Sequence, residues 1–69
     1  MRLSARNIIK GKIQDVKRGA TTAHVKIDVG GGIVVFSSIT NEAVDALELK
    51  VGDAAYAVIK ASDVMVAKD

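Results

Sequence analysis

The sequence predicts an all-β fold, a small five-stranded OB-fold-like barrel with a short helix between the third and fourth strands. Three observations predict it: short runs rich in Val, Ile and Ala, glycine-containing turns between them, and one capped helical stretch after the third run. The chain has 69 residues and no linker or repeat, so residues 1–69 are expected to form one domain. The rival fold is an SH3-like barrel, which normally lacks a helix at this position.

The first two strands are expected on either side of a turn at residues 18–19. Residues 7–17 alternate imperfectly, and Gly11 in their middle predicts a bend or bulge of the kind that a small barrel needs at a corner. Residues 21–29 alternate regularly between apolar and polar side chains, which predicts a second strand. The apolar residues of that strand are Ala23, Val25, Ile27 and Val29.

A short helix is expected in the second half of the chain. Thr40 is a residue type that caps helix N-termini, and residues 41–47 after it carry a short apolar stripe. That stripe consists of Ala43, Val44 and Leu47. Glycines 30–32 predict a hairpin, and residues 50–53 predict a turn. The remaining strands are expected over residues 33–39, 55–59 and 64–67.

The composition favours a protein that is stabilised by its own oligomerisation. Ordering a chain costs roughly 1.5 kcal/mol per residue, which apolar burial only about cancels in so small a domain. The sequence has no cysteine and a single histidine, so disulfides and an intrinsic zinc site are not expected. Subunit association is the remaining means of stabilisation, and a hydrophobic content of 49% supports it.

Charge and targeting signals point to a protein of the cytoplasm. The formal net charge is only +2, and Phe36 and Tyr56 are the only aromatic residues, which disfavours a dedicated nucleic-acid binder. The N-terminus has no signal-peptide pattern, and no apolar run approaches the length of a membrane span. We therefore expect a cytoplasmic protein without a membrane partner.

Two short polar triplets lie near the ends of the chain and carry the functional signal. Ser-Ala-Arg at 4–6 and Lys-Ala-Ser at 60–62 each place a hydroxyl and a cation two residues apart, with an alanine between them. In an extended segment, residues two apart share one face. Neither triplet contains a carboxylate, so each offers donors and positive charge only. Such a donor set favours a small, fully ionised oxyanion.

Each of these residues also has an ordinary explanation. Arg6 alone fits a solvated arginine of the N-terminal segment, and Lys60 alone fits a lysine that extends to the surface. Thr40 needs no ligand to cap a helix, and Glu42 in the first turn opposes an anion there. No Ser-His-Asp or paired-carboxylate arrangement can be argued, and glycines 30–32 lack the Lys-Ser/Thr of a phosphate loop, so no enzyme is expected.

Taken together, the motifs resemble a known family. Ser-Ala-Arg-Asn at 4–7, the glycine hairpin, Ile-Thr at 39–40 and Val-Ile-Lys-Ala-Ser at 58–62 resemble the molbindins, the small molybdate-binding Mop-domain proteins. The likeness covers nearly the whole chain, which has the length of one Mop module. The same module occurs, usually doubled, in molybdate-responsive regulators and transporter ATPases. Because no helix-turn-helix or ATPase region is present, we expect the stand-alone binding form.

The resemblance implies an OB-like barrel that assembles as a homohexamer, a trimer of dimers, with molybdate or tungstate bound at subunit interfaces. It implies no organic cofactor and no free metal cation. Carried over by position, the oxyanion site consists of Ser4, Arg6, Thr40, Lys60, the Ala61 backbone and Ser62, some from a neighbouring subunit. A second site between trimers is assigned, on a weaker match, to Thr21, Thr22 and His24.

The chemistry of the ligand agrees with a donor-only site. Molybdate is a tetrahedral dianion at neutral pH, whereas protonated phosphate carries an O–H that needs an acceptor. Together with the family resemblance, the donor triplets make storage or buffering of molybdate the expected function. Two alternatives stay open: an OB-fold binder of single-stranded nucleic acid, which would need more stacking aromatics, and an interaction module without a ligand, which the apolar composition equally allows.

Overall fold

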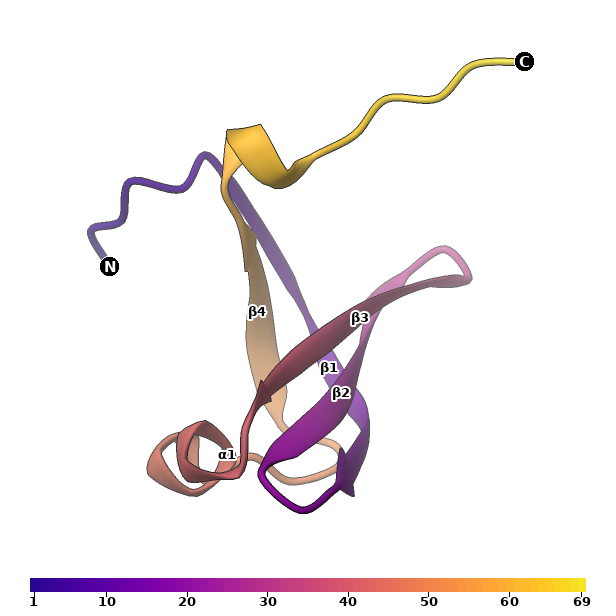
Figure 1. Ribbon diagram of the computed structural model, residues 1–69. Helices are drawn as coiled ribbons and strands as arrows, with labels where there is room; N and C mark the ends of the chain where they lie inside the picture. Colours follow the sequence, from indigo (N-terminus) through magenta and orange to yellow (C-terminus); the bar gives the residue numbers. More distant parts are fainter.

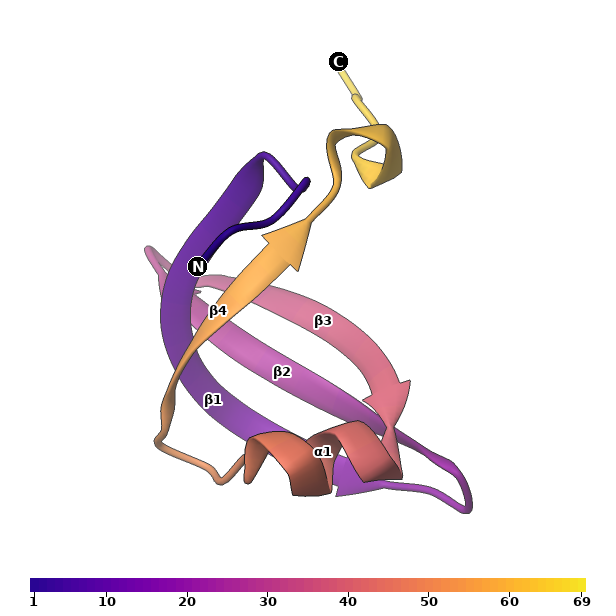
Figure 2. The same cartoon turned by 90° about the vertical axis from the view of Figure 1, so that its left-hand side faces the viewer.

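One antiparallel sheet and one short helix make up the fold in the computed structural model, which describes residues 1–69 (Figure 1). The strands are hydrogen-bonded in the order β3-β2-β1-β4. Figure 2 shows α1 lying across one end of the curved sheet. The elements are β1 Asn7–Arg18, β2 Thr22–Gly30, β3 Ile33–Thr40, α1 Asn41–Leu47, β4 Ala54–Ile59 and a 3-10 turn at Ala61–Asp63.

Strand β1 is long because it belongs to two strand pairs. Its first half pairs with β4 and its second half with β2, and Lys12 has a partner on both sides. The register shifts between Ile13 and Asp15, where Gln14 is left without a partner, and such a bulge increases the bend of a strand. The predicted irregularity of this strand is therefore present, but it lies three residues beyond Gly11.

Gly11 has a different structural role, which is to allow a close backbone approach. A Cβ at this position would lie 2.5 Å from the carbonyl oxygen of Asp28 and 2.9 Å from Cγ2 of Ile27. Both contacts are shorter than ordinary van der Waals separation, and one of them is to a backbone atom that cannot rotate away. Only glycine therefore fits at this point of β1 without moving β2.

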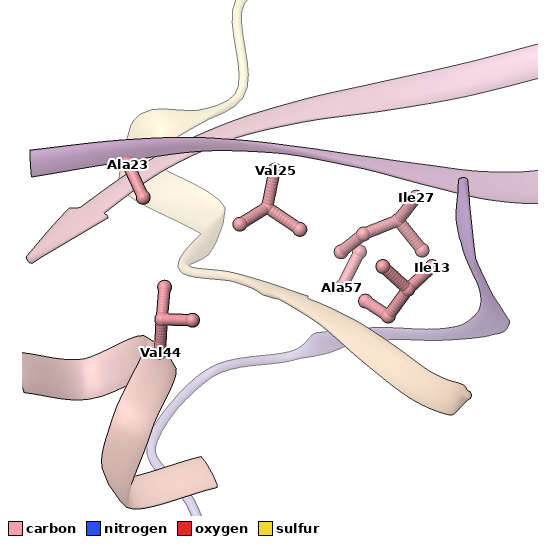
Figure 3. Packing of buried hydrophobic residues seen from close by; sticks show 6 residues of the cluster. All are labelled: Ile13, Ala23, Val25, Ile27, Val44 and Ala57. Atoms are coloured by element: carbon pink, nitrogen blue, oxygen red, sulfur yellow. The ribbon is translucent and has the colours of Figure 1, made fainter. Parts of the chain in front are cut away.

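The core is small and sits between β1, β2, β4 and α1 (Figure 3). Three of the four residues predicted on the apolar face of β2 are buried, and Val29 is partly buried against them. The alternation predicted for this strand is confirmed. The six buried side chains are Ile13, Ala23, Val25, Ile27, Val44 and Ala57.

The helix begins as the sequence predicts and packs through a single residue. Thr40 is the N-cap, and its Oγ1 accepts a hydrogen bond of 3.1 Å from the backbone N–H of Ala43. Val44 is 1% exposed and joins the core, whereas Leu47 is 66% exposed. Leu47 is three residues after Val44 and therefore on the same apolar stripe, but it lines the open apolar groove of the sheet and is not covered by the core.

The predicted fifth strand does not form in the isolated chain. Residues 64–67 have no strand partner and are exposed, so the sheet has four strands and is not closed. The turn at Ala61–Asp63 directs the tail away from the sheet in both views (Figures 1 and 2). A strand needs the backbone groups of a neighbouring edge, and this tail reaches no edge of its own chain. The β2–β3 hairpin over the glycines is present as predicted.

Candidate functional site

The two polar triplets lie together at one end of the sheet. Asn7, the first residue of β1, pairs with Ile59, the last residue of β4. The Asn7 side chain strengthens this pair, because its Nδ2 donates a hydrogen bond of 3.1 Å to the Ile59 carbonyl oxygen. Residues 4–6 and 60–62 therefore continue from neighbouring strand ends, as Figure 1 shows at the top of the molecule. Segments more than 50 residues apart in sequence thus form one polar surface.

The donors of this polar surface have no partners within the chain. Ser4, Arg6, Lys60 and Ser62 are exposed, and none of their side chains makes a hydrogen bond or an ion pair. The single salt bridge of the chain joins Arg18 to Asp45 elsewhere. Arg6 and Lys60 bring two positive charges to this end of the sheet, Ser4 and Ser62 add hydroxyl donors, and the Asp63 carboxylate follows Ser62 in the same turn. Unpaired cations and hydroxyls are the donors that an oxyanion requires.

The turn after β4 adds backbone donors to this surface. The carbonyl of Lys60 accepts from the N–H of Asp63 at 2.9 Å, and that of Ala61 accepts from Val64 at 3.3 Å. The N–H groups of Ala61 and Ser62 have no backbone acceptor, as expected for the first residues of a helical turn. The surface therefore offers hydroxyl, guanidinium, ammonium and amide donors, and the predicted use of the Ala61 backbone is chemically feasible.

Thr40 does not lie with the other five residues assigned to the main site. Thr40 is the last residue of β3 and pairs with Thr22. The N–H of Asn41, the next residue, donates to the Thr21 carbonyl at 2.9 Å. This position is at the far end of β1 from Arg6, beside α1 (Figure 1). The Thr40 hydroxyl oxygen accepts the capping bond, but its hydrogen stays free to donate.

The three residues assigned to a second site share this far end of the sheet. Thr22 and His24 are exposed on the face of β2 opposite the core, and the cross-strand neighbours of His24 are Lys17 and Ser38. Thr21 precedes the strand and contributes its carbonyl to the helix start. Lys17 was not singled out from the sequence; its place beside His24 follows only from the register of β1 and β2.

Asn7, the last residue of the Ser-Ala-Arg-Asn string, joins the two strand ends. Its hydrogen bond to the Ile59 carbonyl is part-buried and joins the strand ends from which the two triplets emerge. Asn7 therefore positions the polar surface without belonging to it. The Ser-Ala-Arg-Asn string draws attention to Asn7, but nothing in the neighbouring sequence identifies Ile59, 52 residues away, as its partner.

Two other features, a metal site and a membrane-spanning helix, were looked for in the structure. No group of three or more His, Cys, Asp or Glu side chains is placed to hold a metal ion. None of the helices has the length and apolar character needed to cross a membrane. The arrangement that remains is a small OB-like domain with unpaired hydroxyl and cationic side chains at one end. Such a donor set is typical of domains that bind oxyanions.

Comparisons with known proteins identify the family of this domain. The TOBE domain family matches residues 3–66. A probable molybdenum-pterin-binding protein of Haemophilus influenzae is 50% identical over 66 residues, covering 96% of both chains. MopII of Clostridium pasteurianum has a TM-score of 0.90 at 39% identity, covering 97% of this chain and 100% of that one. The cytoplasmic molybdate-binding protein ModG, solved with molybdate bound, has a TM-score of 0.89 at 48% identity, covering 94% of this chain and 46% of that one.

The chain therefore belongs to the TOBE-domain family and, within it, to the molybdenum-pterin-binding Mop proteins. The resemblance to the molbindins and the OB-like fold class are confirmed. The relatives and structural neighbours are named for molybdate or molybdenum binding and not for catalysis.

Proposed function

We propose that this protein binds molybdate or tungstate at interfaces between its own copies and thereby stores or buffers the anion in the cytoplasm. The observation that carries the proposal is the meeting of the two donor-only triplets at the joined ends of β1 and β4. The cytoplasmic location is supported by the description of ModG as a cytoplasmic molybdate-binding protein. No catalytic step and no organic cofactor belong to the proposal.

The charges of this surface suit a dianion. Removing a charged group from water is costly unless charge and hydrogen bonds compensate. Arg6 and Lys60 supply two positive charges, and Ser4, Ser62 and the Ala61 N–H supply donors for the anion oxygens. A protonated phosphate would place its O–H against these donors without an acceptor, so the surface favours an anion without a proton.

A position between subunits accounts for the location of Thr40. Within one chain Thr40 is at the far end of β1, so it completes the cage around the anion only if it comes from a second copy. The hexameric assembly implied by the family resemblance, a trimer of dimers, would bring such ends together. The second group, Thr21, Thr22 and His24, is then proposed as a separate anion site at another contact between copies.

Isothermal titration of the purified protein, with its oligomeric mass measured in parallel, tests the proposal. Molybdate and tungstate are expected to bind tightly, at about one or more anions per chain, while sulfate and phosphate give little heat. Silence toward all four anions in an intact oligomer would overturn the proposal and would assign the triplets to subunit contacts. Equal binding of sulfate would contradict the molybdate specificity but keep the oxyanion site.

A further inference from the structure

The face of the sheet opposite the core carries a row of three polar side chains from three neighbouring strands. The register places Lys17 of β1, His24 of β2 and Ser38 of β3 side by side. All three are exposed, and none of their side chains makes a hydrogen bond or an ion pair within the chain. Directly opposite residues of neighbouring strands have Cβ atoms about 4.5–5.5 Å apart, so a small ligand above His24 is within reach of both neighbours.

The rows on either side of this one complete the surroundings of His24. On one side the register pairs Thr22 with Thr40, which adds hydroxyls and no charge. On the other side Lys26 lies between Phe36 and Asp15, and its Nζ is 5.4 Å from the centroid of the Phe36 ring. The helix packs with the core on the other face of the sheet. The row itself therefore contains no carboxylate, and the nearest one belongs to Asp15 in the adjacent row.

Histidine gives this row a property that the two triplets lack. Arginine and lysine side chains keep their charge at physiological pH, whereas an imidazole gains or loses a proton between about pH 5 and 8. The imidazolium offers two N–H donors and a positive charge, and the neutral ring offers one donor and one acceptor. An anion beside His24 and Lys17 therefore interacts more favourably with the imidazolium. Because such coupling is reciprocal, anion binding favours protonation and protonation favours anion binding.

We infer that Lys17, His24 and Ser38 bind a divalent oxyanion on the outer face of the sheet and that His24 takes up a proton when the anion binds. Lys17 and the imidazolium supply two positive charges for the dianion, and Ser38 supplies an O–H donor. The inference rests on the proposed function, since the anion is molybdate, and it names two further residues and a pH dependence for the second anion site. Strands hold all three residues, so their spacing does not depend on a loop.

The two anion sites of the chain then respond differently to pH. The row lies at the end of β1 beside α1, whereas Arg6 and Lys60 lie at the opposite end, where β1 pairs with β4. The triplets keep their charges between about pH 6 and 8, so their affinity stays constant. The row loses a positive charge as the imidazole deprotonates, and its affinity for the dianion falls by about tenfold as the pH rises through the same range. Molybdate is therefore released from the row first when the pH rises.

Nuclear magnetic resonance tests this inference directly, because His24 is the only histidine of the chain. Its ring C–H signal changes its chemical shift with protonation, so one signal reports one group. The signal is followed from about pH 5 to 8 in the full chain, with saturating sodium molybdate or with sodium chloride at the same ionic strength. Molybdate is expected to move the titration midpoint upward by about half a pH unit or more. Equal midpoints in the two salts would overturn the inference.

A matched pair of lysine variants makes the experiment specific to the row. Lys17→Gln removes the charge beside His24, and we expect it to reduce the shift caused by molybdate to less than about half. Lys10→Gln removes the same charge from β1 at an exposed position opposite Tyr56, and it is expected to leave the shift unchanged. Equal shifts in the two variants would show that Lys17 does not contact the anion and would overturn the site.

The variant Arg6→Ala with Lys60→Ala separates this inference from the proposed function. In this variant tight binding in the calorimeter is expected to disappear, while molybdate still moves the midpoint of His24. Loss of the shift would overturn the inference, because the midpoint would then respond to an anion at the triplets. In the native protein, tight binding with a constant midpoint rejects only the outer-face site, and a moving midpoint without tight binding rejects only the site at the triplets.

Discussion

The two ends of β1 differ in how far the chain satisfies its own polar groups. At the end beside α1, Arg18 pairs with Asp45 at 2.6 Å, Thr40 caps the helix, and Asn41 Nδ2 donates to the Gly19 carbonyl at 3.0 Å. One buried atom there, Asn41 Oδ1, has no partner. At the end beside β4, the side chains of both triplets have no partner at all. The first end has side-chain bonds that the chain supplies itself, whereas the donors of both triplets remain free to bind another group.

The same contrast holds for apolar groups. Beside α1, Val44 closes the core against β2 and β3. Along the free edges of β3 and β4, the core stays open as a groove, and large side chains such as Phe36 and Tyr56 are mostly exposed. A small domain can therefore fold around one closed end and leave its other surfaces for assembly. The following predictions test that division, from the largest expected effect to the smallest.

The largest effect is expected from removing the two cations of the polar surface. In the variant Arg6→Ala with Lys60→Ala, each lost charge-assisted hydrogen bond removes about 1.5–3 kcal/mol of binding energy, so molybdate affinity falls by more than about a hundredfold. The free energy of unfolding without ligand stays nearly constant, because neither side chain has a partner in the chain.

Titration calorimetry and urea unfolding measure the two quantities. The matched control is Arg2→Ala with Lys68→Ala, which removes two cations from the exposed ends of the same chain and is expected to keep molybdate affinity within a factor of two or so. Equal losses in both variants would show that net charge, and not the triplets, attracts the anion.

A second prediction concerns Gly11, where the two halves of β1 meet. Gly11→Val places a side chain against the Asp28 carbonyl and Ile27, and we expect the free energy of unfolding to fall by about 3 kcal/mol. Lys10→Val adds the same side chain one residue earlier, at an exposed position, and is expected to change stability by less than about 0.5 kcal/mol. Urea denaturation measures the free energy of unfolding of both variants. Equal values for Gly11→Val and Lys10→Val would contradict the close approach of β1 and β2.

A third prediction compares two residues of α1. Val44→Ala removes buried methyl groups from the core and is expected to cost about 2 kcal/mol. Leu47→Ala, one turn later on an exposed part of the helix, is expected to cost less than about 0.5 kcal/mol. Thermal unfolding measures both. A larger loss in Leu47→Ala that depends on protein concentration would mean that Leu47 contacts a second copy.

The elements that depend on local sequence were predictable. The alternation of residues 21–29, the glycine hairpin and the Thr40 cap each involve residues close in sequence, and all three are present. The apolar stripe of the helix was predictable, but periodicity does not reveal that the core covers Val44 and leaves Leu47 at the open groove. Gly11 was recognised as special, but the nature of the constraint depends on the backbone of β2, which lies elsewhere in the sequence.

What the sequence could not place depends on pairing between distant segments. The pattern of residues 64–67 is that of a strand, but a strand forms only where a free edge is within reach, and this chain offers the tail none of its own edges. The meeting of residues 4–6 with 60–62 depends on the register of β1 and β4. The separation of Thr40 from Arg6 likewise follows from topology. The sequence therefore allowed the residues of the candidate site to be predicted, but it did not show which of them lie together in one chain.

Thr40 has a role within its own chain and a proposed role toward a second copy. Within its own chain it caps α1, and in the proposed assembly its free O–H faces an anion held by a second copy. Thr40→Ala is expected to lower stability by about 1 kcal/mol through the lost cap. Thr40→Asp keeps a side-chain oxygen for the cap, so stability should stay near that of the native protein, yet its negative charge would repel the anion. Molybdate titration and urea unfolding of both variants separate the two roles: if the Asp variant binds molybdate like the native protein, Thr40 only caps the helix and the anion site ends at the two triplets.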